Sequence, residues 1–553
     1  MGRRTLEDRL LGRPRPRGLH RRAFLGTLAG VAACGTTSKG KGSDSSGETG
    51  LDTGEPDLDG TCEPGTPTAA GSIEDVRPSP FSDNPFQLGV ASGDPLFDRV
   101  ILWTRLVADP TDVAASPADE ADVIWEVADS QDFGNILQQG VFVASAALAH
   151  AVHVDVDGLE ADTVYWYRFR CGDHTSAVGR TKTLPCPDAR PESARIGFAT
   201  CQNWMSGFYA SHRSMAEAEL DLIVFLGDYI YESGTTGAVR DHGAPEPFDL
   251  DGYRDRHGLY RSDADLQASH ASAPWMPIWD DHEVDNNHAG RVTDDTDFAA
   301  RRAAAYQAWY EHMPVRLPVP SAGDTAWDIH RHVDFGTLAR VILLDGRQYR
   351  DEQPCNDDIG AACDEVHDDR TLLGVDQEAW VDSAFEGQAA DWVVVGNPVV
   401  MLPLDLGGVF LNPDQWDGYP TARARFLDAV AAWAPGRTVV FTGDIHAAGV
   451  GVVPEDPTVY ESTPAIAEFI VPATSSRVTY DLADTVGPLL ANQAHIEWWD
   501  WSVNGWTEAI VTAAGLEAVY HLVNDVTDAA SDVQAARRWR VVPGDLRPVD
   551  LDA

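Results

Sequence analysis

The chain contains 553 residues, of which 43% are hydrophobic and 17 are tryptophan, and its formal net charge is -46. This length and apolar content are sufficient for two substantial hydrophobic cores, which excludes a fibrous or wholly disordered chain. The negative charge argues against binding of DNA or RNA, because it would repel a polyanion, but it is compatible with a small phosphate ester held through metal ions.

Residues 1–34 have the features of an export signal. Two arginines, Arg21 and Arg22, precede an apolar segment over 23–33 that is too short to span a bilayer as a helix. This pattern predicts recognition by the twin-arginine export machinery. The tetrapeptide VAAC resembles a bacterial lipobox and predicts lipid attachment at Cys34; a plain cleavage site with a chance cysteine is the alternative. We therefore expect a periplasmic or cell-surface protein that contacts the membrane only through a lipid anchor.

The next segment, residues 35–80, has the composition of a linker. It is rich in Gly, Ser, Thr, Asp, Glu and Pro and offers few residues for burial, as in the run SDSSGETGLDTGEPDLDGT. Such a segment cannot bury enough apolar surface to offset the entropy lost on folding. We expect a flexible acidic linker between the export signal and the folded domains.

Several of the seven cysteines are candidates for disulfides, as is typical of an exported protein. Cys355 and Cys363 flank a short acidic loop, CNDDIGAAC, and predict a local disulfide. Cys171 and Cys186 are candidates for a second one. Cys62 has no evident partner in the sequence.

Between residues 81 and 187 the pattern is that of short, half-buried strands. Valines alternate with polar residues over 152–156, and aromatic residues recur at every second position over 165–169. This period of two, with turn signals such as Asp157-Gly158, predicts antiparallel strands. We expect a small β-sandwich of the immunoglobulin or fibronectin III type. No cluster of titratable residues stands out in it, so we expect a role in packing.

From residue 190 to residue 553 the pattern changes to continuously apolar runs separated by helical stretches. Such runs are typical of strands buried on both faces, and they read RIGFATC, LDLIVFLGD, WMPIWDDHE, RVILLDGR, DWVVVGNP and RTVVFTGDIH. One helix is clear, because large apolar residues repeat at three- and four-residue spacing over 306–313 before Pro314. This alternation predicts an α/β domain with right-handed crossovers and largely parallel pairing in its core.

Polar residues follow the apolar runs where each strand should end. In such sheets, ligands bind beyond the carboxyl ends of the strands. The residues at or near these positions are Cys201, Asp228, Tyr231, Asp281, His282, Arg347, Asn397, Asp444 and His446. A thiolate, a carboxylate, a phenolate and an imidazole form a suitable shell for trivalent iron. Asp444 and His446 are two residues apart in a segment expected to be extended, so their side chains should point the same way.

A second set of donors suits a harder cation. Asp281, with Asn286 or Asn287, offers oxygen ligands typical of calcium, and the two oxygens of Asp228 can serve both ions. Each residue alone has a simpler explanation, because a strand-end aspartate is usually a turn or helix cap and a lone cysteine is most often just buried. The combination favours a site, since five separate apolar runs each end in a potential ligand or phosphate contact.

A resemblance to a known family rests on a series of ordered sequence blocks. These are GVASGDP, VILWTRL, ATCQNW, LGDYIYE, WDDHEVDNN, LDGRQYR and FTGDIHAAG. In this order they resemble the alkaline phosphatase D (PhoD-like) family of exported metallophosphatases. The resemblance extends from about residue 81 to the segment HIEWWDWSVNGW, which covers most of the mature chain. It implies a β-sandwich domain followed by a four-layer metallophosphatase domain of mixed α and β structure, built around a mixed β-sandwich core.

The resemblance also implies a metal site that holds Fe³⁺ and Ca²⁺. Carried over to this sequence, the Fe³⁺ ligands are Cys201, Asp228, Tyr231 and His446, and the Ca²⁺ ligands are Asp228, Asp281, Asn286 and Asp444, with Asn287 as the alternative to Asn286. The sequence does not decide between the two asparagines.

We therefore expect hydrolysis of a phosphate ester by a metal-activated oxygen, without an amino-acid nucleophile. His282 is expected to protonate the leaving oxygen or to donate a hydrogen bond to the phosphoryl group, and Arg347 and Asn397 are expected to contact the phosphate. Ser383 is expected to lie on the surface. A phosphodiesterase or phospholipase D-like hydrolase would use the same site. The alternative of another class is a non-catalytic, calcium-dependent surface adhesin.

Overall fold

The computed structural model describes most of the chain beyond the predicted export signal. The described residues are 62, 65, 67, 73–234, 237–290, 296–319, 327–358, 360, 362–387, 389–404, 410–478, 486–490 and 492–553. The predicted signal over 1–34, with Cys34, and most of the predicted linker over 35–80 lie outside them. None of the helices within the described residues combines the length and the apolar character that a membrane span requires.

The largest sheet has ten strands and contains a parallel centre. Its order is β22 (Asp545–Asp550), β21 (Val533–Val542), β20 (Gly515–Val523), β19 (Asn504–Thr512), β9 (Ala194–Ala199), β10 (Leu222–Phe225), β11 (Pro274–Pro277), β1 (Val90–Gly93), β2 (Val100–Arg105) and β5 (Ala151–Val156). The strands from β9 to β1 pair in parallel, and the others pair antiparallel. The expected parallel core is therefore confirmed, with antiparallel strands on both sides.

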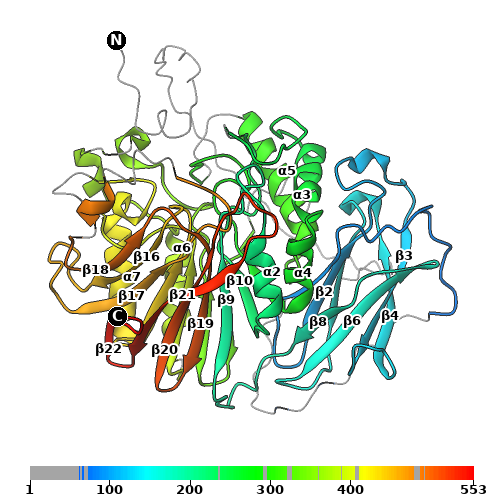
Figure 1. The fold of residues 1–553 in the computed structure, drawn as a ribbon, viewed down its shortest axis with the longest axis horizontal. Coiled ribbons are helices and arrows are strands. Elements are labelled where there is room, and N and C mark those ends of the chain that lie inside the picture. Colours follow the sequence, from blue (N-terminus) through cyan, green and yellow to red (C-terminus); the bar gives the residue numbers. More distant parts are fainter. Residues whose placement is uncertain are drawn as a thin grey trace, which may run out of the picture.

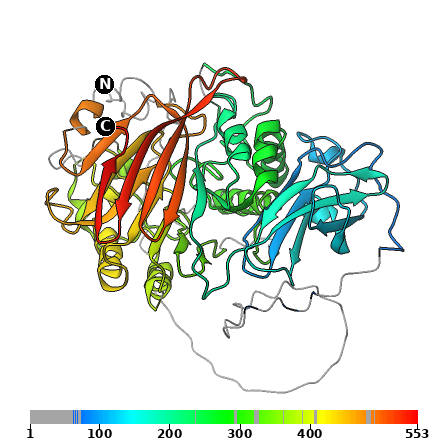
Figure 2. The ribbon, with the colours of Figure 1, turned by 60° about the horizontal axis from the view of Figure 1, so that its bottom comes forward.

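A second sheet of seven strands faces the first (Figures 1 and 2). Its order is β12 (Arg331–Phe335), β13 (Ala339–Leu343), β14 (Trp392–Asn397), β15 (Thr438–Thr442), β17 (Pro464–Ile470), β16 (Ala448–Pro454) and β18 (Ile496–Asp500). The strands from β13 to β17 in this order are parallel. Phe198 in β9 stacks on Phe441 in β15 with ring centroids 4.0 Å apart, so the inner faces of the two sheets share one core.

Helices pack beside both sheets. The helices are α2 (Ala210–Glu217), α3 (Leu250–Arg261), α4 (Ala264–Ser272), α5 (Thr296–His312), α6 (Val375–Phe385) and α7 (Pro420–Trp433). Figure 1 shows α2 to α5 together, between the centre of the ten-stranded sheet and the N-terminal strands. The buried residues of α6 and α7 form a second core with residues of the seven-stranded sheet. The helix predicted over 306–313 is confirmed as the end of α5, and Ser383 is exposed on α6 as expected.

The predicted N-terminal sandwich is present, but one of its two sheets is hydrogen-bonded to a strand of the following domain. A five-stranded sheet of β3 (Ala121–Ala128), β4 (Ile136–Ala144), β6 (Val164–Cys171), β7 (His174–Thr175) and β8 (Gly179–Lys182) packs on β1, β2 and β5. β1 also pairs with β11, with Ser92 opposite Pro274. The strands β1, β2 and β5 of the sandwich therefore form one end of the ten-stranded sheet. Without β11, β1 would be an edge strand of the sandwich with unpaired backbone groups.

One of the two predicted disulfides is present in the structure, and the other cysteine pairing differs from the prediction. Cys355 and Cys363 are bonded, as predicted, whereas Cys186 is bonded to Cys62. The pairing considered for Cys171 and Cys186 is wrong: Cys171 is a free, buried thiol. Cys171 ends β6 on its buried face and packs in the sandwich core.

Candidate metal centre

The predicted ligands lie in sharp turns that follow the parallel strands. Cys201 follows β9, Asp228 follows β10, and Asp444 and His446 follow β15. Their φ angles are 54°, 59°, 63° and 55°, in a left-handed region that costs energy for non-glycine residues and is often found at functional sites. The expectation of an extended segment at Asp444 and His446 is wrong, because the chain turns at both residues and directs them into different groups of ligands.

Three of the predicted iron ligands, Cys201, Asp228 and His446, form one such group, in which the candidate ligand atoms lie within 4.8 Å of one another. The Tyr231 hydroxyl donates to Oδ2 of Asp228 at 2.7 Å and lies 2.9 Å from Nε2 of His446. Oγ of Ser476 lies 2.8 Å from both the Tyr231 hydroxyl and the carbonyl oxygen of Cys201. The structure thus brings together all four residues that are predicted to bind iron.

Two further groups extend this site toward the predicted calcium ligands. Asp280, Asp281 and Asp444 form one, and Asp228, Asp281 and His282 form the other, each with ligand atoms within 4.8 Å. Asp228 is shared with the iron group, and Asp281 belongs to both further groups. These three groups therefore form one continuous site, joined through Asp228 and Asp281.

The electrostatics of these residues fit bound cations. Oδ1 of Asp228 and Oδ1 of Asp281 are buried and have no hydrogen-bond partner among the described residues. A buried carboxylate oxygen without a partner is costly, and a cation would satisfy it. Burial raises the pKa of the Cys201 thiol and of the Tyr231 phenol well above their usual values, so a nearby positive charge is needed to stabilise the anionic forms. Burial lowers the pKa of His446 to about 4, which leaves a neutral imidazole suited to metal binding.

His282 stands at the edge of the site with a fixed ring. Its Nδ1 lies 2.6 Å from Oε2 of the buried Glu232, and its ring centroid is 4.1 Å from that of Tyr231. Burial disfavours the charged imidazole, but the carboxylates of Asp281, Glu232 and Asp228 outweigh burial and raise the pKa of His282 well above its usual value. An imidazolium held in this way can donate a hydrogen bond or a proton through Nε2.

Arg347 and Asn397 are placed differently from the prediction. Arg347 is fully buried, and its guanidinium pairs with Asp280 at 2.5 Å and with Asp414 at 2.8 Å. Asn397 is also buried, donates to the carbonyl oxygen of Val399 and accepts from the indole of Trp416. Both side chains have their polar atoms engaged inside the protein. Arg347 also lies 3.6 Å from Oδ1 of Asp444. The geometry therefore does not support the expected phosphate contacts.

The asparagine pair lies next to Asp281. The backbone N–H of Asn287 donates to Oδ2 of Asp281 at 2.5 Å, and the side-chain amide of Asn287 donates to Asp357 at 2.8 Å. Asn286 is half-buried in the same turn. The pair therefore lies beside Asp281, and its role as a calcium ligand stays a prediction.

Two supporting residues were missed by the sequence reasoning. Glu283, within the block WDDHEVDNN, is buried and accepts hydrogen bonds from the backbone N–H groups of Asp228, Tyr229 and Asp280. Its position inside one of the blocks that carry the family resemblance was a signal that it supports the site. Asp414 pairs with the buried Arg347, and no sequence pattern indicated it, because it lies outside the regular strands and helices.

Comparison with known proteins identifies the family. A model of the PhoD-like phosphatase family matches residues 196–520, and a model of the N-terminal domain of PhoD-like phosphatases matches residues 71–185. Alkaline phosphatase D of Bacillus subtilis (strain 168) is 40% identical over 476 residues, which cover 83% of this chain and 81% of that protein. The chain belongs to the PhoD-like phosphatase family.

A solved structure described as that of PhoD supports the same assignment. It matches with a TM-score of 0.81 and 38% sequence identity, and the match covers 86% of this chain and 93% of that chain. This PhoD-like phosphatase is accordingly a hydrolase of phosphoric esters, and the groups of candidate ligands are in keeping with a metal-dependent enzyme. The family resemblance carried by the ordered sequence blocks is confirmed.

Proposed function

We propose that this PhoD-like phosphatase is an exported alkaline phosphatase that hydrolyses phosphate esters at a centre of Fe³⁺ and Ca²⁺. The observation that carries the proposal is the convergence of Cys201, Asp228, Tyr231 and His446 next to Asp281. A thiolate, a phenolate and an imidazole together suit ferric iron. On the other side of Asp228, the oxygen donors of Asp281, Asn286 and Asp444 suit calcium.

The residues of this site have complementary roles in hydrolysis. When bound, the metal ions supply Lewis-acid chemistry that lowers the pKa of water and balances the charge of the phosphate. Glu232 holds the Nδ1 side of His282, so that Nε2 is the atom that donates to the leaving oxygen. Glu283 holds the turns at Asp228 and Asp280 in place through their backbone N–H groups.

Arg477 is the residue that we assign to the phosphate in place of Arg347. It directly follows Ser476, which contacts Tyr231, and its backbone hydrogen-bonds to His446. Its side chain is exposed, and the nearest charge known to act on it is that of Asp525, whose pKa it helps to lower. In a protein with a formal net charge of -46, an exposed guanidinium that follows directly on a residue of the metal site would attract an anionic substrate and bind its oxygens in a bidentate manner.

We also infer the finer architecture that the sequence predicted. Four layers are supported by the stacking of Phe198 on Phe441 between the two sheets, and by helices beside each sheet. The immunoglobulin or fibronectin III character of the sandwich is supported by the packing of its two sheets around one core.

Export by the twin-arginine route and lipid attachment at Cys34 remain predictions. They are supported by Arg21, Arg22 and the VAAC tetrapeptide. The test is expression of the full chain in a bacterial host with radiolabelled palmitate. Wild type should be labelled and Cys34→Ser should not, and labelling of both would contradict the assignment.

The metal centre is tested by metal analysis of the purified protein together with Tyr231→Phe. Wild type should contain iron and calcium and should show a visible absorption band from the phenolate ligand, which the variant should shift or lose because it lacks the phenol oxygen. Activity on monoester and diester substrates should fall by about 100-fold or more on treatment with a chelator. Hydrolysis that is indifferent to chelators would overturn the proposal.

A further inference from the structure

A chain of hydrogen bonds connects Asp281 to a loop that is remote in sequence. Oδ2 of Asp281 accepts from the backbone N–H of Asn287, and the side-chain amide nitrogen of Asn287 donates to Oδ2 of Asp357 at 2.8 Å. The first bond leaves Oδ1 of Asp281 as the oxygen that has no hydrogen-bond partner within the described part of the chain. Asn287 thus helps to fix the orientation of the Asp281 carboxylate, and the amide of Asn287 is itself held by Asp357.

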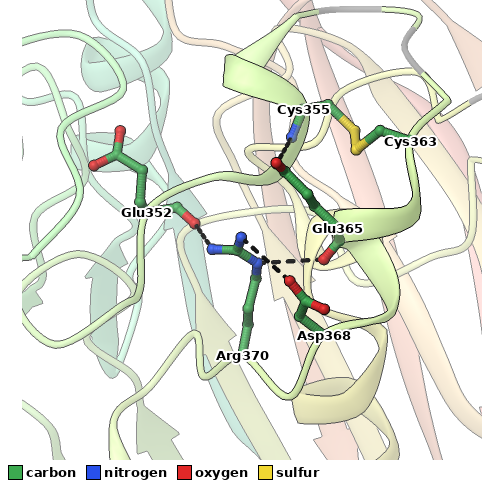
Figure 3. Close-up of a disulfide and its surroundings, with 6 residues drawn as sticks. All are labelled: Glu352, Cys355, Cys363, Glu365, Asp368 and Arg370. Carbon is green, nitrogen blue, oxygen red and sulfur yellow. Dashed lines mark hydrogen bonds and ion pairs between the residues drawn. A yellow bond between two sulfur atoms is a disulfide. The ribbon is translucent and has the colours of Figure 1, made fainter. Parts of the chain in front are cut away.

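The loop that carries Asp357 is closed by the disulfide between Cys355 and Cys363 (Figure 3). The backbone N–H of Cys355 donates to the Glu365 carboxylate at 3.0 Å, and Arg370 donates to the carbonyl oxygen of Glu352 at 2.7 Å. These contacts fix the start of the short turn η3 (Pro354–Asp357) against the segment that follows it.

The backbone of this loop is held in an unfavourable conformation. Cys355, Asn356 and Asp357 have φ angles of 60°, 55° and 57°, although none of them is glycine. Consecutive left-handed residues persist only where the surrounding structure determines them. The disulfide is a covalent constraint of this kind, because it joins the first of these residues to the far end of the loop.

Gln353 provides a second connection from the same segment. Its side-chain amide lies 2.8 Å from the carbonyl oxygen of Asn287 and 2.6 Å from Oδ1 of Asp414. Asp414 in turn pairs with Arg347, which pairs with Asp280 beside Asp281. Asn287 is therefore held at both its backbone and its side chain by the segment from Gln353 to Asp357.

We propose that the disulfide-closed loop is a positioning element for the metal centre, and that Asp357 is the residue through which it acts. Asp357 does not touch the substrate or the metal in this assignment. It fixes the amide of Asn287, which keeps Asp281 in the orientation that binds a cation. The inference rests on the proposed metal centre, because it concerns the affinity of that centre for calcium.

The test is calcium binding by the full-length protein, measured by isothermal titration after removal of calcium with EGTA. Asp357→Ala should raise the Ca²⁺ dissociation constant by about 10- to 100-fold, which is the range typical of residues that orient a metal ligand. The melting temperature of the calcium-free variant should stay within about 2 °C of wild type. Asp357→Asn should restore most of the affinity, because its Oδ1 can still accept from Asn287.

Matched controls separate this role from general effects of charge and cross-linking. Asp364→Ala removes an exposed acid of the same loop and should leave the affinity unchanged. Cys355→Ser with Cys363→Ser should weaken calcium binding, whereas Cys62→Ser with Cys186→Ser should not. Equal calcium affinity of wild type and Asp357→Ala would overturn the role of Asp357. Equal losses of calcium affinity in the two double cysteine variants would overturn the role of the disulfide between Cys355 and Cys363. Failure of wild type itself to bind calcium would instead overturn the proposed metal centre.

Discussion

Single buried side chains hold the turns of the metal centre in place. Glu283 accepts hydrogen bonds from the turn after β10 and from the turn after β11, so one carboxylate joins two loops that are about 50 residues apart in the chain. Arg347 has the same kind of role below the site through Asp280 and Asp414. The site is thus pre-organised by residues that do not face the substrate.

At the surface of the site, the prediction concerns Arg477. Arg477→Ala should lower kcat/KM for a phosphate ester by about 10- to 100-fold, which corresponds to about 1.4 to 2.7 kcal/mol of lost charged contact. Steady-state kinetics in low salt will measure it. Arg477→Lys should recover part of the loss, since it keeps the charge but not the bidentate geometry.

A control variant tests whether the effect of Arg477 is only one of net charge. Arg190 is an exposed arginine that pairs with Asp391, away from the predicted ligands in the fold. Arg190→Ala should leave kcat/KM within about twofold of wild type. If both alanine variants lose the same activity, Arg477 has no specific contact with the substrate.

At the scale of the elements, the pairing of β1 with β11 joins the N-terminal sandwich to the catalytic domain. Gly93 in β1 lies opposite Trp275 in β11. A Cβ atom built on Gly93 would lie 2.1 Å from the carbonyl oxygen of Pro314 and 2.6 Å from that of Trp275. The absence of a side chain therefore allows the close approach of three backbone segments.

Gly93→Ala should consequently destabilise the protein. Because both clashing atoms belong to the backbone, the neighbours must move, and we expect a loss of about 3 kcal/mol in the free energy of unfolding. Urea denaturation measures this loss. Gly234→Ala is the matched control, because the nearest atom to its Cβ would be 3.6 Å away; a similar loss in both variants would contradict the explanation.

At the scale of the whole molecule, the two parts are joined by buried polar contacts as well as by the continuous sheet. His153 in β5 lies with Nε2 2.9 Å from the carbonyl oxygen of Met313, just beyond α5, and stacks on Tyr310 with ring centroids 4.5 Å apart. Burial lowers the pKa of His153 to about 4. The neutral ring is therefore part of the interface between the sandwich and the catalytic domain.

This contact predicts a loss of stability in acid. As the pH falls, His153 takes up a proton near pH 6.5 in the unfolded chain but only near pH 4 in the folded chain. The contribution of His153 to the free energy of unfolding is therefore fully present above pH 6.5 and is lost as the pH falls toward 4. The loss can reach about 3 kcal/mol. Urea denaturation at several pH values should show that the free energy of unfolding depends less on pH in His153→Gln than in wild type. The same pH dependence in both proteins would refute this assignment.

Much of the fold could be read from the sequence, because burial on both faces of a strand leaves a continuous apolar run. The runs that end near Cys201, Asp228 and Asp281 are strands β9, β10 and β11, and the alternation over 165–169 is seen in β6. The candidate ligands were also recognisable, since they follow those strands. The partner of Cys62 was not, because disulfide pairing depends on proximity in space.

The sequence by itself determined which segments form strands and which side chains stand at their ends, since both depend on local patterns of burial and chemistry. Only the tertiary structure decided how those side chains are used. It turned Asp444 and His446 into different groups of ligands, placed Arg347 among buried carboxylates, and brought Asp357 to Asn287 across 70 residues of chain. These outcomes depend on long-range packing and on which polar groups find partners, neither of which leaves a local signal.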